Sequence, residues 1–226
     1  MAIVLLVALV GSMGFTPNKV EQTGNGSYNG HEYVDLGLPS GTLWATCNVG
    51  ANNPEDYGNY YAWGETSTKP IYSWDNYRYC KGKNVLFTKY CNVSRLGNNG
   101  FTDDLVILQP GDDAATVNWG RDWRMPTKDD FWELFNNTRY IWMTKNGVCG
   151  MLFYASNGNA IFLPAAGIGY DKGIGSPGEV GSYWTSLLDT GFTSMSWHLQ
   201  FDSKDIGTWW TERKYGLSVR PVCSKH

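Results

Sequence analysis

The strongest constraint on the fold is the alternation of apolar and polar residues between Ser196 and Asp202. Trp197, Leu199 and Phe201 occupy every second position, and the residues between them are polar. Successive side chains of a β-strand point to opposite faces of its sheet, so this pattern predicts a half-buried antiparallel strand. Residues 217–222 alternate in the same way and predict a second strand, at the end of the chain.

The segment between these strands, Ser203–Gly216, has no such period and places Trp209 and Trp210 among charged residues. Neighbouring residues on a strand face opposite ways, so we expect at least one of the two indoles to point out of the core. Large apolar side chains in an aperiodic polar loop favour contact with a partner. We therefore expect a rigid scaffold whose binding face lies in this part of the chain.

Most of the remaining elements have the composition of short strands separated by turns. The predicted strands are Tyr33–Leu36, Thr42–Val49, Asn84–Tyr90, Tyr140–Met143, Gly150–Ala155 and Ala160–Pro164. Asn157–Asn159 is typical of a hairpin turn, whereas residues 52–79 and 167–181 lack a period and predict packed loops. Runs of strands with one or two segregated helices indicate an α+β fold.

Two helices are expected near the middle of the chain. The acid pair Asp112–Asp113 supplies an N-cap for a short helix that stops at Gly120; calcium binding by the pair is a weaker alternative. Thr127 and Asp130 then have the spacing of a capping box, with Asp in place of Glu. Apolar residues recur at i, i+3 and i+4 from Phe131, which predicts a second helix over residues 128–138.

Composition excludes some classes of partner. The chain has 226 residues and a formal net charge of −3, so there is no electrostatic case for nucleic acid or an anionic membrane. Charged residues make up only 17% of the chain and aromatic residues 15%. This profile is typical of a loop-rich extracellular β or α+β domain.

Ala2–Val10 is a short apolar run followed by small residues. Its length suits the apolar region of a signal peptide and is too short to span a bilayer, although no Lys or Arg precedes it; a buried strand is the alternative. We expect residues 1–14 to be a signal peptide, 15–30 a linker and 31–226 a single ligand-binding domain. The mature protein would be secreted or on the cell surface. No cysteine lies near the apolar run, so a lipid anchor is not supported.

Five cysteines are present, and export permits disulfides. An odd number leaves at least one thiol unpaired within the chain. Cys80 and Cys91 flank a predicted hairpin and form one candidate pair, whereas Cys47 and Cys223 can pair only if the first and last strands are neighbours. The spacings match no zinc site, and the connectivity stays open.

Catalytic and metal-binding motifs are missing. The three histidines form no metalloprotease motif, and the chain has no Gly-x-Ser-x-Gly elbow. No spacing of acidic residues singles out an acid–base pair. We therefore expect a protein that is not an enzyme and uses no cofactor or metal.

Several motifs follow one another in the order of a known family. They are His31–Gly50, Tyr61–Glu65, Asp112–Thr116, Trp123–Phe131 with Pro126 inside it, Ile161–Gly167 and Gly216–Val222 with Arg220 inside it. Over about residues 31–223 the chain resembles the Fibrobacter succinogenes major paralogous domain, which is related to the formylglycine-generating-enzyme type of C-type lectin fold. The resemblance implies a compact α+β domain, secreted or at the cell surface, whose first and last strands pair. It makes a Cys47–Cys223 bridge reasonable and gives Pro126 and Arg220 structural roles.

Several members of this group are variable proteins of diversity-generating retroelements, in which a reverse transcriptase rewrites adenines and scatters substitutions over a ligand-binding face. The resemblance leads us to expect such a diversified face over about residues 183–216. Where Asn is common in the family, this chain has Leu187, Phe192, Ser194, His198, Gln200, Thr208, Trp209 and Trp210. A protein or glycan ligand would be anchored by Trp209, Trp210, Arg213 and Tyr215, with polar contacts from His198, Gln200 and Lys204.

Three other functions compete with this interpretation. Calcium-dependent sugar binding lacks the Glu-Pro-Asn and Gln-Pro-Asp tripeptides, which Gln109–Asp112 only approaches, but calcium-independent glycan stacking on tryptophan is an alternative. A structural subunit of a surface fibre, a pilus tip or a phage receptor-binding protein is another. The related formylglycine-generating enzymes use a cysteine pair near the C-terminal part of the fold. Only Cys149 and Cys223 lie in that half here, so an enzyme of this type is less favoured.

Overall fold

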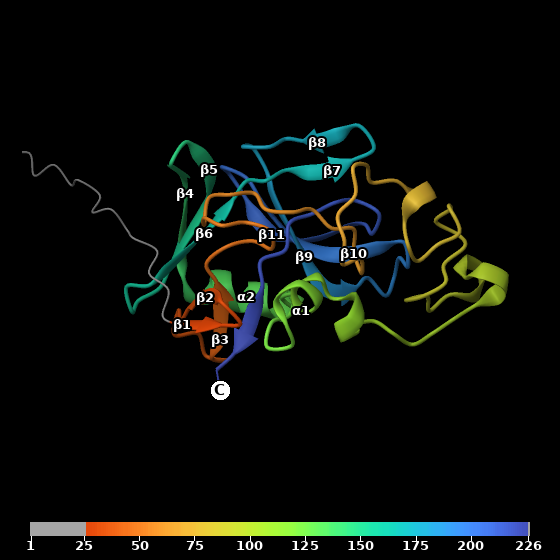
Figure 1. The fold of residues 1–226 in the computed structure, drawn as a ribbon, viewed down its shortest axis with the longest axis horizontal. Coiled ribbons are helices and arrows are strands. Elements are labelled where there is room, and N and C mark those ends of the chain that lie inside the picture. The colour runs from red at the N-terminus through yellow and green to blue at the C-terminus, as the bar shows by residue number, and fades with distance from the viewer. Residues whose placement is uncertain (1–25, 226) are drawn as a thin grey trace, which may run out of the picture.

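The computed structural model describes residues 26–225. Antiparallel sheets and two α-helices dominate the regular structure of this part of the chain, which confirms the predicted α+β class (Figure 1). Four short 3-10 helices, Trp74–Asn76, Ser94–Leu96, Asn98–Gly100 and Pro110–Asp112, lie between β3 and α1. The expected signal peptide and most of the expected linker lie outside the described residues. No helix within residues 26–225 is long and apolar enough to cross a membrane.

The first sheet joins the two ends of the described chain. Its strands are β1 (Gly26–Tyr28), β2 (His31–Val34), β3 (Thr42–Ala45) and β12 (Val222–Ser224), paired in this order. Val222 lies opposite Trp44 of β3, so the last strand shares a sheet with the first strand but does not pair with it, and the expected pairing of the first and last strands is wrong. The boundary predicted at residue 31 is wrong, because Gly26–Tyr28 pairs with β2 and belongs to the sheet.

The second sheet lies near the centre of the molecule (Figure 1). It has the order β11 (Ile206–Glu212), β10 (Met195–Phe201) and β9 (Gly181–Leu188). β10 confirms the strand predicted from the alternating pattern, to within one residue. The loop predicted over Ser203–Gly216 is wrong, because seven of its residues form the edge strand β11, opposite β10.

A predicted C-terminal strand over residues 217–222 is also wrong for most of its length. Leu217 and Ser218 make only isolated bridges, and regular pairing begins at Val222. Pro221 has no N–H to donate to a ladder. Every residue from Gly216 to Cys223 is buried, so this segment runs through the interior rather than along a half-exposed sheet.

The third sheet contains β4 (Arg139–Lys145), β5 (Val148–Tyr154) and β6 (Ala160–Pro164), in that order. These strands confirm the three that were predicted in this part of the chain. The predicted Gly-rich loop contains a further hairpin, β7 (Ile168–Tyr170) and β8 (Gly173–Gly175). The strand predicted over Asn84–Tyr90 is absent, since Phe87 alone makes isolated bridges there.

Both predicted helices are present, with the predicted caps. In α1 (Ala114–Trp119) the N-cap carboxylate of Asp113 accepts hydrogen bonds from two backbone N–H groups, and Gly120 follows the last turn with a φ of 100°. In α2 (Lys128–Asn137) Thr127 and Asp130 form the expected capping box. These short-range signals therefore set both helix starts correctly.

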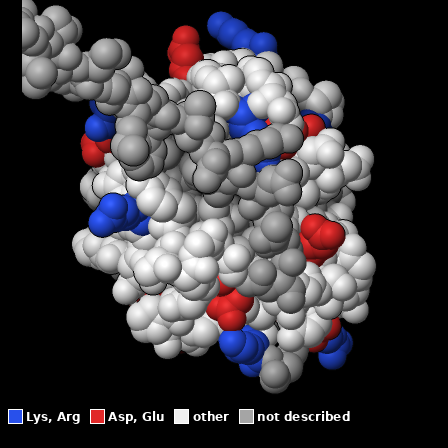
Figure 2. Space-filling model, turned by 90° about the vertical axis from the view of Figure 1, so that its left-hand side faces the viewer, with Lys and Arg blue, Asp and Glu red and all other residues white. Residues whose placement is uncertain are grey.

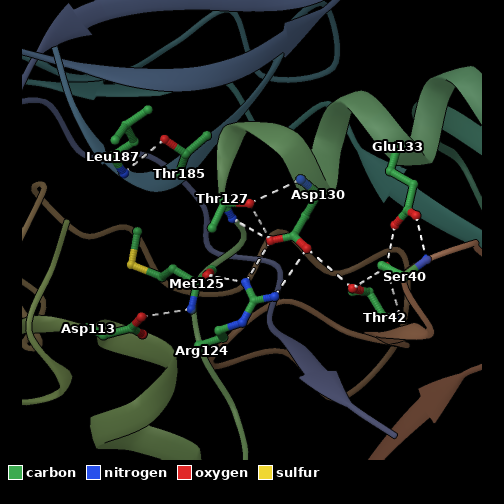
Figure 3. A network of polar contacts seen from close by, with 10 residues as sticks. All are labelled: Ser40, Thr42, Asp113, Arg124, Met125, Thr127, Asp130, Glu133, Thr185 and Leu187. Carbon is green, nitrogen blue, oxygen red and sulfur yellow. Dashed lines mark hydrogen bonds and ion pairs between the residues drawn. The ribbon is translucent and has the colours of Figure 1, made fainter.

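Asp130 also attaches α2 to the rest of the fold (Figure 3). Its carboxylate accepts hydrogen bonds from the Arg124 guanidinium at 2.6 Å and from the Thr42 hydroxyl at 3.3 Å. Burial by itself would raise the pKa of this carboxyl. The hydrogen bonds from Arg124 and Thr127 outweigh the effect of burial, so the pKa of Asp130 is lowered. Ser40 donates to Glu133 one helical turn further on. The helix is thus held against the start of β3.

The central sheet is covered on both faces. Tyr183 belongs to one hydrophobic cluster, with Phe131 and Leu199, whereas its neighbour Trp184 belongs to the other. Part of the second cluster comes from Tyr61–Cys91, in the long segment between β3 and α1, whose later part, yellow to yellow-green, lies to the right in Figure 1. β10 is therefore not a half-buried strand, and its polar face is mostly buried.

Candidate ligand-binding surface

Three exposed aromatic side chains lie together on the side of the central sheet that carries α2. Trp132, Phe192 and Trp210 are 50%, 60% and 48% exposed. We call these three residues, with Trp197, Thr208 and Lys128 beside them, the aromatic surface. Phe192, Thr208 and Trp210 were among the predicted contacts, and the structure brings them together here.

The rings of the aromatic surface hold one another in place. Phe192 stacks on Trp210 with centroids 6.4 Å apart and an interplanar angle of 14°. Trp197, directly opposite Trp210 in the register of β10 and β11, meets it edge-on at 5.4 Å. The Nζ atom of Lys128 lies 3.4 Å from the Trp197 ring centroid, a cation–π contact. The surface is therefore organised before any ligand arrives.

Trp132 reaches this surface from α2. Its indole Nε1 donates to the hydroxyl of Thr208 at 3.2 Å, and its ring packs at a tilt against Phe135. Trp132 was not predicted as a contact. The signal was present, because the apolar stripe that begins at Phe131 leaves the next position, Trp132, outside the buried face.

The loop that carries Phe192 is held by Asp189. One carboxylate oxygen of this buried residue accepts the N–H groups of Gly191 at 2.8 Å and Phe192 at 2.9 Å. The Phe192 carbonyl in turn accepts the N–H of Met195 at 2.7 Å. Phe192 therefore sits on a closed turn.

Trp209 lies on the opposite face of β11. Its ring covers Gly207, where a Cβ would lie 2.7 Å from the indole. It is opposite His198 in the register and is 37% exposed. Trp209 and Trp210, both predicted as anchors of one ligand-binding face, therefore lie on opposite faces of β11, because neighbouring strand residues face opposite sides.

His198 is not an exposed polar contact. It is only 2% exposed, because the 61–91 segment covers this side of the sheet. Its ring meets the Trp184 ring edge-on, with centroids 6.1 Å apart. Its Nε2 lies 3.3 Å from the amide oxygen of Gln200, which is only partly buried. Burial lowers the pKa of His198 to about 4.

Arg213 is not a surface anchor either, since it is fully buried. Its guanidinium donates to the Tyr77 hydroxyl at 3.0 Å, to the Tyr90 carbonyl at 2.8 Å and to the Thr193 carbonyl at 3.0 Å. The residue fastens the end of β11 to the long loop. An arginine in an aperiodic polar segment gave no sign of this burial.

Four other predicted contacts lie apart from the aromatic contacts above. Leu187 forms an isolated bridge with Ile107, and the Ser194 carbonyl accepts the N–H of Arg213. Tyr215 packs edge-on against Tyr170 at 4.8 Å, beside the β7–β8 hairpin. Lys204 is exposed in the turn between β10 and β11.

All five cysteines are free thiols in the structure. The Cys47–Cys223 bridge is not formed because the register places other residues opposite each other. Cys223 lies opposite Leu43. The N–H of Ala45 donates to the Pro221 carbonyl, and the N–H of Val49 donates to the Val219 carbonyl. Cys47, midway between Ala45 and Val49, therefore lies beside Arg220. The alternative Cys80–Cys91 bridge is not formed either.

Arg220 and Pro126 occupy interior positions that join separate elements. The Arg220 guanidinium donates to Asn48 at 2.8 Å and to backbone carbonyls of Thr46 at 2.9 Å and Phe162 at 3.0 Å. The carbonyl of Pro126 accepts the N–H of Ser186 at 2.8 Å. Both residues therefore contribute to the frame of the fold.

Charge and metal chemistry give little indication of another site. Basic and acidic residues are interspersed over the face shown in Figure 2, and neither sign forms a continuous patch there. Within residues 26–225 no group of three or more His, Cys, Asp or Glu side chains is placed to hold a metal ion. The aromatic surface is thus the clearest candidate for contact with a ligand.

Comparison with known proteins adds no identification, since no family model, curated protein or solved structure matches this chain.

Proposed function

We propose that this protein is a non-enzymatic binding protein with a C-type-lectin-like fold, secreted or displayed at the cell surface, that binds a protein partner through the aromatic surface. One observation carries the proposal: Phe192 and Trp210 are each about half exposed and stack on one another, and the half-exposed Trp132 of α2 bonds to Thr208, two residues before Trp210 on β11. Contiguous exposed apolar side chains on a folded domain mark interaction sites.

The energetics favour this use of the surface. Tryptophan and other aromatic residues contribute the largest share of binding energy at protein interfaces. Here the rings are already fixed by stacking and by the Trp132–Thr208 hydrogen bond, so binding orders few additional side chains. The scaffold supplies rigidity, and the exposed side chains supply the contact.

A protein suits this surface better than a glycan. Sugar hydroxyls need acceptors, but the carboxylate of Glu212, two positions beyond Trp210 on β11, is engaged by Lys214 at 2.9 Å and by the Trp74 indole at 3.3 Å. The groups in contact with the rings of the aromatic surface are instead other aromatic rings, the Thr208 hydroxyl and the Lys128 ammonium. This composition matches an apolar interface core with a charged rim.

Diversification is part of the proposal. Phe192, Thr208 and Trp210 point out of the core, so other side chains at these positions would leave the core volume unchanged. The gene's neighbourhood should then contain a reverse transcriptase and a near-copy of the codons for residues 183–223 that differs mainly at adenines. A neighbourhood without such a copy removes diversification from the proposal and leaves the binding surface to be tested by itself.

Binding is tested with a phage-displayed random peptide library selected on the wild-type protein. We expect enriched peptides to lose at least about tenfold in affinity for a Phe192→Ala/Trp210→Ala variant, because two interface anchors are removed. Trp209→Ala is the matched control, since Trp209 is exposed to a similar degree on the other face. Peptides that bind the double variant as tightly as wild type, or the absence of enrichment, would count against the proposal.

A further inference from the structure

A concave site separate from the aromatic surface lies at the other end of β11. It is a cavity of about 390 Å³ between the edge strand β4 and the turn that joins β10 to β11. Its lining residues are Tyr140, Ile141, Trp142, Met151 and Asp202–Ile206. Ile206 and Trp210 are four residues apart on one strand, roughly 13 Å at the usual rise, so the cavity is distinct from the aromatic surface.

One wall of the cavity is apolar and firmly packed. The ring of Tyr140 is 45% exposed and rests at a tilt on Phe153, with centroids 6.0 Å apart. Trp142 meets Phe201 of the core edge-on at 6.4 Å. Met151 lies opposite Trp142 in the β4–β5 register. This wall offers aromatic and aliphatic carbon whose position is set by the core.

The other wall is polar and is fixed by its own backbone. Asp202 Oδ1 accepts the N–H groups of Lys204 at 2.6 Å and Asp205 at 2.9 Å. Asp205 Oδ1 accepts the N–H of Ile206 at 2.8 Å. Each carboxylate is therefore oriented through one oxygen, which leaves its second oxygen to accept a hydrogen bond from a ligand.

This wall also supplies donors. Lys204 is exposed, and its ammonium makes no ion pair with another residue of the described chain. Ser203 adds a hydroxyl, which both donates and accepts. An anionic ligand would meet two carboxylates and a cationic ligand would meet the ammonium. A neutral ligand rich in hydroxyls can use both kinds of group at once.

We propose that this cavity binds one sugar ring of a neutral glycan, with carbon–hydrogen faces of the ring on Tyr140 and Trp142 and hydroxyls bonded to Asp202, Lys204 and Asp205. The volume falls within the range of small-molecule sites, which combine an apolar lining with a few convergent polar groups. The site uses no residue of the aromatic surface, so it stands or falls separately from the proposed protein-binding function.

The test is an NMR titration of the ¹⁵N-labelled protein with the methyl glycosides of glucose, galactose and mannose and of N-acetylglucosamine, each at millimolar concentration. We expect one or more of them to shift the Trp142 indole N–H and the Asp205 and Ile206 amides saturably. Lys204→Ala should weaken this binding by about tenfold, because a charged hydrogen bond is lost. Tyr140→Ala should weaken it through loss of stacking.

Trp210→Ala is the control variant and should leave the glycoside titration unchanged while it weakens peptide binding at the aromatic surface. Lys204 is exposed in a turn, so its substitution keeps the test valid if Tyr140→Ala lowers stability. The proposal is overturned if none of the four glycosides moves these resonances, or if the shifts persist with unchanged affinity in Lys204→Ala and Tyr140→Ala.

Discussion

The guanidinium carbon of Arg213 lies 4.3 Å from the ring centroid of Phe87, deep in the interior. The hydrogen-bond partners of this cation are neutral oxygens, from the Tyr77 hydroxyl and the carbonyls of Lys89, Tyr90 and Thr193. A buried charge is costly unless it is fully hydrogen-bonded. Arg213 therefore ties the end of β11 to the long loop through bonds that no other side chain can reproduce together.

We predict that Arg213→Ala lowers the free energy of unfolding by about 3–5 kcal/mol, because it leaves several buried carbonyls unsatisfied and opens a cavity. The measurement is equilibrium denaturation in urea. Arg95→Ala is the matched control, since Arg95 is exposed, and should change stability by no more than about 0.5 kcal/mol. Equal effects of the two substitutions would show that Arg213 does not hold the loop.

Stability should also depend on His198. Its folded-state pKa is lowered from 6.5 to about 4 by burial, so the unfolded chain binds a proton first as the pH falls. The stabilisation is complete above about pH 6.5 and is lost progressively down to about pH 4. Over this pH window the contribution of His198 to the free energy of unfolding falls by about 3 kcal/mol, for a pKa shift of this size.

The check is urea denaturation of wild type and His198→Gln over this pH window. The variant has no group that titrates at position 198, so its stability should fall less steeply, whatever its value at neutral pH. Asp112 and Asp130 have lowered pKa values and lose their contributions below the window, in both proteins alike. Parallel curves would mean that His198 is accessible to protons in the folded state.

Local signals predicted much of this fold. The Thr127–Asp130 capping box and the 157–159 turn each depend on a few neighbouring residues, and both are where the sequence places them. β11 was missed because an edge strand owes its position to pairing with β10 rather than to its own periodicity. The burial of His198 and Arg213 depends on the Tyr61–Cys91 segment, more than 100 residues away, which no short pattern encodes.

The candidate site could likewise be predicted only in part, because some of its residues come together through long-range packing. Adjacent tryptophans in a polar segment pointed to Trp210, and the family resemblance pointed to Phe192, whose loop is near the strand of Trp210 in sequence. Trp132 joins them from α2, more than 50 residues earlier, and only the packing of α2 on the sheet shows this. Which face each tryptophan occupies required the register of β11, which separates Trp209 from Trp210.

The thiols provide a further test of the register at the two chain ends. Three of the five cysteines, Cys80, Cys91 and Cys223, are buried, and burial raises the pKa of Cys223 to about 12. A buried, protonated thiol reacts slowly with alkylating reagents. Under native conditions iodoacetamide should therefore modify Cys47 and Cys149, which are partly exposed, and largely spare the other three.

After denaturation without reductant, peptide mass spectrometry should find all five cysteines alkylated. Protein purified under reducing and under non-reducing conditions should give the same result, because Cys47 lies beside Arg220 and not beside Cys223. A Cys47–Cys223 crosslinked peptide in the non-reduced sample would require β12 to shift along β3 by several residues. That shift would remove Leu43 from its place opposite Cys223, so the crosslink would overturn the register of the sheet that joins the two ends of the described chain.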